Sequence, residues 1–179
     1  MRAKWLRVTA VAALAAGCGE GRAIFDVDVY SFLRGTGADT VSYFIAPARS
    51  ADAYTVRKIS LPGAGSSIVD QAHVTGTAEF VNTSGSGKLS LQLYLAEDSI
   101  GTYAPGALAL QVDSTTITGP GTFPVGFDTD LAAAIQVLAK SEVWVRLVGG
   151  GSNTGLTLLA GDLVFKSLTI RVVIADKFF

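Results

Sequence analysis

The sequence has few of the residues on which enzymes and metal-binding proteins depend. Its 179 residues contain one His, one Cys and one Met. A single Cys excludes an internal disulfide framework, and one imidazole with one thiol is fewer ligands than a tetrahedral structural zinc site requires. Charged residues make up 16% of the chain and hydrophobic residues 49%, so the chain can bury a core and is not disordered. The length is that of one domain.

The N-terminal segment has the pattern of a secretory signal. Three basic residues (Arg2, Lys4 and Arg7) precede a short apolar run, Val8–Ala16. This run is shorter than the ~20 residues that a membrane-spanning helix needs. A basic start, a short apolar stretch and small residues at its end predict a signal peptide over residues 1–17.

The residues at the end of this segment, Leu14-Ala15-Ala16-Gly17-Cys18, resemble the lipobox of bacterial lipoproteins. In that family the signal is removed before the Cys, whose sulfur then carries a diacylglycerol. The resemblance implies lipid attachment at Cys18 and a place in the bacterial cell envelope. Ala15 departs from the family, which most often has Leu there. Gly19 stands where Asp would retain a lipoprotein at the inner membrane, which favours the outer membrane. The alternative is an ordinary secretory signal with a chance Cys.

Cleavage before Cys18 changes the charge of the chain. It removes three of the 14 basic residues and none of the 15 acidic ones, so the formal net charge falls from −1 to −4. The 11 basic residues that remain are outnumbered by 15 acidic ones, so the domain has no basic excess to follow a phosphate backbone. This argues against nucleic acid as a partner. The resemblance implies that the protein reaches the membrane through the lipid on Cys18. The tether, residues 18–23, spans about 20 Å at most, so we expect the domain to lie close to the membrane.

The rest of the chain, residues 24–179, alternates apolar and polar residues with the period of a β-strand. The clearest run is Lys88–Ala96, in which every second residue is Leu. About eight or nine short strands separated by turns predict a single all-β domain, an antiparallel β-sandwich. The pattern occurs in ten segments, some of them very short: Ile24–Leu33, Thr40–Ala46, Tyr54–Leu61, Ala72–Asn82, Lys88–Ala96, Ala107–Asp113, Thr115–Thr118, Glu142–Val148, Leu156–Ala160 and Leu163–Ala175.

Several local patterns refine this prediction. Thr83–Gly87 is typical of a hairpin turn, and Asp128–Lys140 predicts one short helix capped by Asp128 or Asp130. The glycines of Gly149–Gly151 are expected to end a strand. The alternative fold is a small outer-membrane β-barrel, which also combines a signal peptide, alternating strands and a terminal aromatic residue. The uneven strand lengths and the helix argue against it.

His73 is the imidazole that any Ser-His-Asp hydrolase here would have to use. Asp70 lies three residues before it, but the sequence contains no G-x-S-x-G motif. His73 shares one face of its predicted strand with Thr75, Thr77 and Glu79, so we interpret it as a solvent-facing strand residue. We expect no catalytic activity and no cofactor.

Carboxylates occur as three pairs, Asp26-x-Asp28, Glu97-Asp98 and Asp128-x-Asp130. Oxygen ligands of this kind suit calcium, yet none of the pairs fits the calcium loop D-x-[DN]-x-[DN]-G. The simpler interpretations are that the first pair lies on the solvent-exposed face of a strand, the second in a turn, and the third at the start of a helix as caps. Whether a pair binds calcium stays open at the level of sequence, and we predict no metal site.

A candidate contact patch comes from aromatic residues beside an arginine. Trp144 and Arg146 are out of register with the apolar residues of their strand, so both are expected to face outward near Tyr94. Equally, Trp144 could lie under the predicted helix. Phe178 and Phe179 either pack back on the domain or await a partner.

These features together predict a non-catalytic, lipid-anchored envelope protein that acts as an accessory or structural subunit and docks on a membrane-associated protein assembly. The alternative is a carbohydrate- or small-ligand-binding sandwich, with the loops Gly119–Phe127 and Gly149–Gly155 as candidate binding loops. A hydrolase built on His73 is the third hypothesis.

Overall fold

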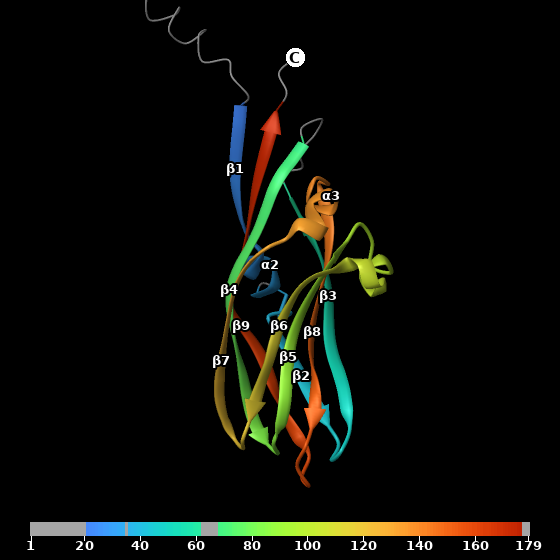
Figure 1. Cartoon of the computed structure of the whole chain (residues 1–179), viewed down its shortest axis with the longest axis vertical. Helices are drawn as coiled ribbons and strands as arrows, with labels where there is room; N and C mark the ends of the chain where they lie inside the picture. The colour runs from blue at the N-terminus through green and yellow to red at the C-terminus, as the bar shows by residue number, and fades with distance from the viewer. Residues whose placement is uncertain (1–20, 35, 62–67, 177–179) are drawn as a thin grey trace, which may run out of the picture.

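The structure, a computed structural model, describes residues 21–34, 36–61 and 68–176. Over these residues nine strands pair into two antiparallel sheets (Figure 1). The predicted signal peptide, Cys18, Phe178 and Phe179 lie outside the described residues. Within the described ranges, no helix is long and apolar enough to cross a bilayer.

The larger sheet has five strands, and its centre is the long strand β9 (Leu159–Asp176). The end of β9 pairs with β1 (Gly21–Asp28), and its beginning pairs with β2 (Thr40–Ile45). On its other side β9 pairs with β4 (Ile68–Ser84), and β4 pairs with the edge strand β7 (Gly121–Asp130).

The smaller sheet has the order β3 (Ser50–Ser60), β8 (Glu142–Asn153), β5 (Gly87–Ala96) and β6 (Leu108–Ile117). Every pair is antiparallel. The chain therefore forms the predicted antiparallel sandwich, and the alternative of a single closed sheet is not adopted.

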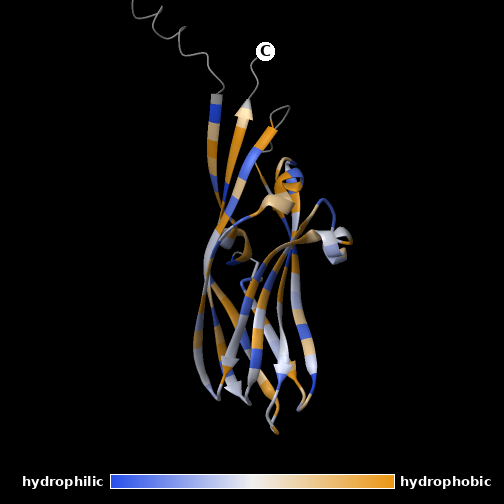
Figure 2. Ribbon diagram, in the orientation of Figure 1, coloured by the Kyte–Doolittle hydropathy of each residue, from blue (hydrophilic) through white to orange (hydrophobic). Residues whose placement is uncertain are grey.

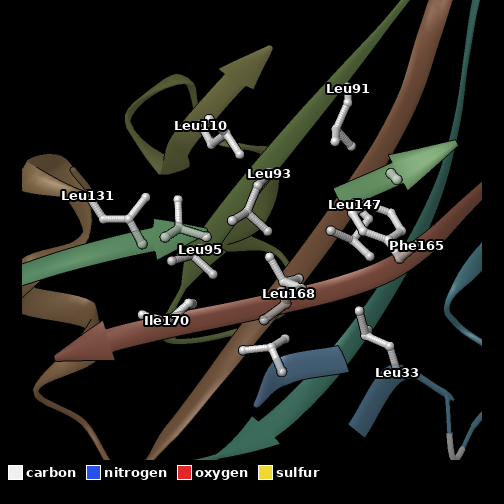
Figure 3. Close-up of a cluster of buried hydrophobic side chains, with 14 of the residues drawn as sticks. Leu33, Leu91, Leu93, Leu95, Leu110, Leu131, Leu147, Phe165, Leu168 and Ile170 are labelled. Atoms are coloured by element: carbon white, nitrogen blue, oxygen red, sulfur yellow. The ribbon is translucent and has the colours of Figure 1, made fainter. Parts of the chain in front are cut away.

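The core lies between the sheets, where the period-two pattern sends alternate side chains inward. The four leucines of β5 are buried, and Figure 3 shows Leu93 and Leu95 lying with Leu168 of β9 across the interior. Each such side chain contributes roughly 1.5–3 kcal/mol through its removal from water. Leu168, Ile170, Val172 and Ile174 of β9 alternate along the strand and are all buried on this face.

The predicted hairpin over Thr83–Gly87 is wrong. β4 belongs to the larger sheet and β5 to the smaller one, so the turn connects the two sheets. Side-chain hydrogen bonds hold this turn: the Asn82 amide donates to the backbone oxygen of Gly85, and the Thr83 hydroxyl donates to that of Ala160. In this arrangement the apolar faces of β4 and β5 meet across the core.

The first predicted strand, Ile24–Leu33, ends earlier than expected. After Asp28 the chain enters the helix α2 (Val29–Arg34). Oδ1 of Asp28 accepts a hydrogen bond from the backbone N–H of Ser31, which satisfies a donor at the start of the helix. Val29 and Leu33 are both buried, because residues four apart share one face of a helix.

The predicted helix Asp128–Lys140 is also shorter than expected. Strand β7 runs through Asp130, so neither aspartate caps a helix. The helical part consists of one 3₁₀ turn, Ala132–Ala134, and the helix α3 (Ile135–Leu138). The sequence prediction missed β7 because Pro124 and several glycines weaken its pattern. A proline is compatible with a strand that pairs on one side only.

Other strand ends also differ from the prediction. β8 continues through Gly149–Gly151, where a Cβ on Gly151 would lie 2.1 Å from the backbone oxygen of Lys88. Glycine therefore allows the strands to approach at this point. The two segments predicted around Asp113 form the single strand β6, whose pairing with β5 contains register shifts.

The strands β1, β4 and β9 extend past α3 at one end of the molecule (Figure 1). We call the paired residues 21–28, 68–75 and 169–176 the three-stranded end. The connection between β8 and β9, residues 154–158, lies at the opposite end of β9.

Candidate functional site

The candidate site lies on the outer face of the smaller sheet and is built around Arg146. On β8, Arg146 alternates with the buried Val145 and Leu147, so its side chain points outward as predicted. Its register neighbours are Tyr94 on β5 and Val56 on β3.

The guanidinium of Arg146 is held on several sides. Its central carbon lies 3.9 Å from the centroid of the Tyr94 ring and 4.5 Å from that of Tyr103. Nε and Nη2 both donate to the backbone oxygen of Thr102, at 3.0 and 2.8 Å. Arg146 therefore fixes the 3₁₀ turn η1 (Gly101–Tyr103) on the sheet, and its charge is already engaged within the protein.

This arrangement presents two tyrosines to solvent. The rings of Tyr54 and Tyr103 have centroids 5.8 Å apart and planes at 87°. Tyr54 is 55% exposed and Tyr103 is 52% exposed. The hydrogen bond with Tyr54 raises the pKa of the Tyr103 hydroxyl above its ordinary value, and burial adds to this. We call Tyr54, Tyr94, Tyr103 and Arg146 the tyrosine surface.

The structure brings together part of the predicted contact patch. Tyr94 and Arg146 are in direct contact, and the Tyr94 hydroxyl donates to Oε1 of Gln92. Trp144 lies two residues along β8 on the same face, half-buried, with Lys58 and Ala96 as register neighbours. Helix α3 packs against β4 of the other sheet, so the data favour the outward placement of Trp144.

Sequence reasoning missed the two exposed tyrosines. Tyr54 lies in a predicted strand, but the alternation of that strand does not identify its neighbour in the sheet. Tyr103 lies in a turn whose placement depends on Arg146, which is 43 residues later in the chain. An aromatic residue in a turn, such as Tyr103, is a signal of a possible contact surface. The local sequence does not show which strands that turn packs against.

A second polar cluster crosses the outer face of the larger sheet. In register across four strands lie Asp26, Arg171, His73 and Asp130. Nε and Nη2 of Arg171 donate to the two carboxylate oxygens of Asp26, at 2.8 and 3.1 Å. This bidentate contact lowers the pKa of Asp26 and raises that of Arg171.

His73 lies on the outer side of β4, as predicted, and contacts carboxylates through both ring nitrogens. Nδ1 lies 2.7 Å from Oδ1 of Asp130, and Nε2 lies 2.6 Å from Oδ1 of Asp128. A neutral imidazole has one N–H, so two such hydrogen bonds require the protonated ring. The bonds to Asp130 and Asp128 raise the pKa of His73, and burial opposes the rise. The other predicted partner, Asp70, pairs with Arg22 at 3.3 Å.

The three predicted carboxylate pairs have protein partners. Besides the pairs at His73 and Arg171, Glu97 pairs with Lys140 at 3.2 Å, and Asp98 accepts the backbone N–H of Gly101. Among residues 21–34, 36–61 and 68–176, no group of three or more His, Cys, Asp or Glu side chains is arranged to hold a metal ion.

The loops predicted for ligand binding are mostly strands. Residues 121–127 belong to β7 and residues 149–153 to β8. The connections that remain are residues 118–120 and 154–158. The ligand-binding hypothesis therefore loses the two long end loops on which it depended.

No family model and no curated protein matches the sequence. Solved structures with a similar arrangement include that of the infectious bursal disease virus Gx strain, at 10% identity and a TM-score of 0.47, covering 89% of this chain and 33% of that chain. Another is CBM28, a carbohydrate-binding module specific for non-crystalline cellulose, at 10% identity and a TM-score of 0.38, with 71% of each chain covered. The chain spans about a third of the viral chain. These values carry no argument about function.

Proposed function

We propose that this chain is a non-catalytic, lipid-anchored protein of the bacterial cell envelope, an accessory subunit that docks on a membrane-associated protein assembly through the tyrosine surface. The observation that carries the proposal is the pair Tyr54 and Tyr103, half-exposed and held in place by Arg146. The anchor is the lipid on Cys18, supported by the likeness of Leu14–Cys18 to a lipobox. Gly19 supports the outer membrane as its location.

The chemistry of the tyrosine surface suits a protein partner. Tyrosine and arginine are enriched among the residues that dominate binding energy at protein interfaces. A tyrosine that is already packed loses little conformational entropy on binding. Because the rings of Tyr54 and Tyr103 stand at 87°, they do not form the flat platform on which a sugar ring would stack across both. This favours protein docking over the carbohydrate alternative.

The His73 geometry supports a non-catalytic role. A general base needs a free nitrogen lone pair. Both nitrogens of His73 contact carboxylate oxygens, and the raised pKa favours the protonated ring, which has no lone pair to offer. A hydrolase that uses His73 as its base would first have to break one of these contacts.

The test is the mass of the particle that carries the native protein after extraction of its own membranes in mild detergent. We expect a particle far heavier than one lipidated domain, with defined co-purifying chains. Tyr54→Ala and Tyr103→Ala should release these chains, while Phe44→Ala, which removes an exposed ring from β2, should retain them.

Two outcomes would contradict the proposal. A monomer that stays alone at high protein concentration argues against a subunit role. Partner chains that remain bound to both tyrosine variants exclude the tyrosine surface. Binding of the monomer to polysaccharide, lost in Tyr54→Ala, would support the carbohydrate alternative instead.

A further inference from the structure

We infer that the outer face of the three-stranded end rests on the surface of the lipid bilayer, so that the protein touches the membrane with side chains as well as with its lipid. This inference rests on the lipid anchor of the proposed function. It concerns a different surface from the tyrosine surface, on the other sheet.

The outer face of this end carries apolar side chains on three neighbouring strands. Ile24 of β1 is 63% exposed and Ile68 of β4 is 53% exposed. Between them on β9 lie Val173, the register partner of Ile24, and Ala175, the register partner of Ile68. Two polar residues share this face: Arg22 is the β1 register partner of Ala175, and Gln71 is the β4 register partner of Val173. Arg22 also pairs with Asp70 of β4 at 3.3 Å. Single exposed apolar residues are ordinary, but these lie on three neighbouring strands and can meet one surface together.

The same face becomes charged one row further along the strands. Ile24 is followed on its side of β1 by Asp26, which pairs with Arg171, and His73 lies next in that row. The apolar side chains therefore lie between the Arg22–Asp70 pair near the tip and a second charged row, about 7 Å beyond Ile24, formed by Asp26, Arg171 and His73. Figure 2 shows both hydrophobic and hydrophilic residues on the strands at this end. Such an arrangement suits shallow contact with a bilayer, in which the apolar side chains meet the lipid while Arg22 reaches the level of the headgroups and the second charged row stays in water.

The position of Cys18 selects the lipid surface as the occupant of this patch. Cys18 precedes Gly21, the first residue of β1, by three residues, so its Cα lies at most about 11 Å from the start of the strand. An acylated Cys18 holds this end against the membrane. The tether raises the local concentration of the apolar patch at the bilayer, so that a weak contact is effective.

The opposite end of the molecule provides a matched control. Leu156 is 96% exposed and lies in the connection before β9, whose first residue is about 45–55 Å along the strand from the register partners of Ile24 and Ile68. It is as apolar as Ile24 and more exposed. If exposure alone caused membrane contact, Leu156 would show it too. If the position of the lipid anchor determines which residues contact the membrane, Leu156 stays in water.

The experiment uses the mature lipidated protein in phosphatidylcholine vesicles. Acylation occupies the sulfur of Cys18, so single cysteines can be introduced as Ile24→Cys, Ile68→Cys or Leu156→Cys and labelled with the polarity-sensitive dye NBD. We expect a several-fold rise in NBD emission at positions 24 and 68, quenched by spin-labelled lipid. Position 156 should keep the emission of a dye in water.

Each other outcome overturns the inference. If the protein is acylated and bound to vesicles but positions 24 and 68 behave like position 156, the contact is absent and the anchor stands. If their emission rises without quenching by lipid, a second copy of the chain covers the patch. If mass spectrometry finds no acyl group on Cys18, both the anchor and the contact fail. Circular dichroism of each labelled variant verifies that it is folded.

Discussion

Nδ1 of His73 lies 2.7 Å from Oδ1 of Asp130, directly across the ladder between β4 and β7. The other nitrogen of the same ring contacts Asp128, so one imidazole joins two carboxylates of the edge strand to its neighbour. β7 pairs with the sheet on one side only, and Pro124 supplies no N–H to the ladder. The side-chain contacts therefore add to the ten register pairs that attach this edge strand to β4.

The first prediction is that this attachment depends on pH. The hydrogen bonds to Asp130 and Asp128 raise the pKa of His73 in the folded protein. The stabilisation is therefore complete below the unfolded pKa of about 6.5 and is lost as the pH rises through the folded pKa. We expect His73→Gln to lower the melting temperature at about pH 5, with the difference from wild type shrinking toward about pH 9.

Thermal unfolding followed by circular dichroism across this range measures the effect. Lys58→Gln is the control, because it breaks an exposed ion pair with Glu142 that contains no histidine. Its difference from wild type should be flat with pH. A flat profile for His73→Gln as well would show that the imidazole contributes nothing through its charge.

The same cluster shows what sequence reasoning can and cannot supply. The outward placement of His73 follows from the alternation of β4, which is local. The role of Asp128 and Asp130 does not, because an aspartate before an apolar run is also typical of a helix start. The local pattern of Asp128–Lys140 therefore predicts a helix. The contact with His73 depends instead on pairing between residues more than 50 positions apart, which no local pattern contains.

The sequence also fails, for a related reason, to predict which strands belong to the same sheet. The leucine pattern of β5 predicted a strand and its buried face correctly. It did not predict that β4 and β5 lie in different sheets, because a hairpin and a connection between sheets both need a short turn with glycine. The difference lies in side-chain contacts such as that of Asn82 with the backbone oxygen of Gly119, 37 residues away.

The second prediction concerns Arg146. Arg146→Lys keeps the charge but loses the planar group that lies against Tyr94 and Tyr103 and the paired donors to Thr102. We expect a loss of about 1–2 kcal/mol in the free energy of unfolding. Urea denaturation followed by Trp144 fluorescence measures it. Arg57→Lys, at an exposed position of β3, should change stability by less than about 0.5 kcal/mol. Equal effects for both variants would contradict the role given to Arg146.

The third prediction compares two glycines with left-handed backbone. Gly85 has φ of 76° and Gly37 has φ of 68°. A Cβ on Gly85 would lie 2.5 Å from the backbone oxygen of Leu158, whereas a Cβ on Gly37 would meet nothing within 4 Å. We expect Gly37→Ala to cost about 1 kcal/mol, from the backbone conformation alone. Gly85→Ala should cost about 2–4 kcal/mol, because overpacking is added. Similar losses in urea denaturation would show that the turn adjusts freely.

The fourth prediction concerns Asn153, which is 3% exposed at the end of β8. Its Nδ2 donates to the backbone oxygens of Ile45 and Thr157, both at 2.8 Å, and its Oδ1 accepts the backbone N–H of Gly155. The amide thus joins β2, β8 and the connection to β9, and all its hydrogens are used. Asn153→Asp keeps the shape but turns two donors into an oxygen that faces two carbonyl oxygens.

We therefore expect Asn153→Asp to lower the free energy of unfolding by about 3 kcal/mol at neutral pH. The new carboxyl group has a raised pKa in the folded state, since burial and the carbonyl oxygens disfavour its charge. The penalty should be smallest near pH ~4, where the protonated group can donate once, and should grow as the pH rises. Gln111→Glu makes the same chemical change at an exposed position of β6 and should have little effect at either pH. If the two variants lose the same stability, the connection between β8 and β9 does not depend on Asn153 for its shape.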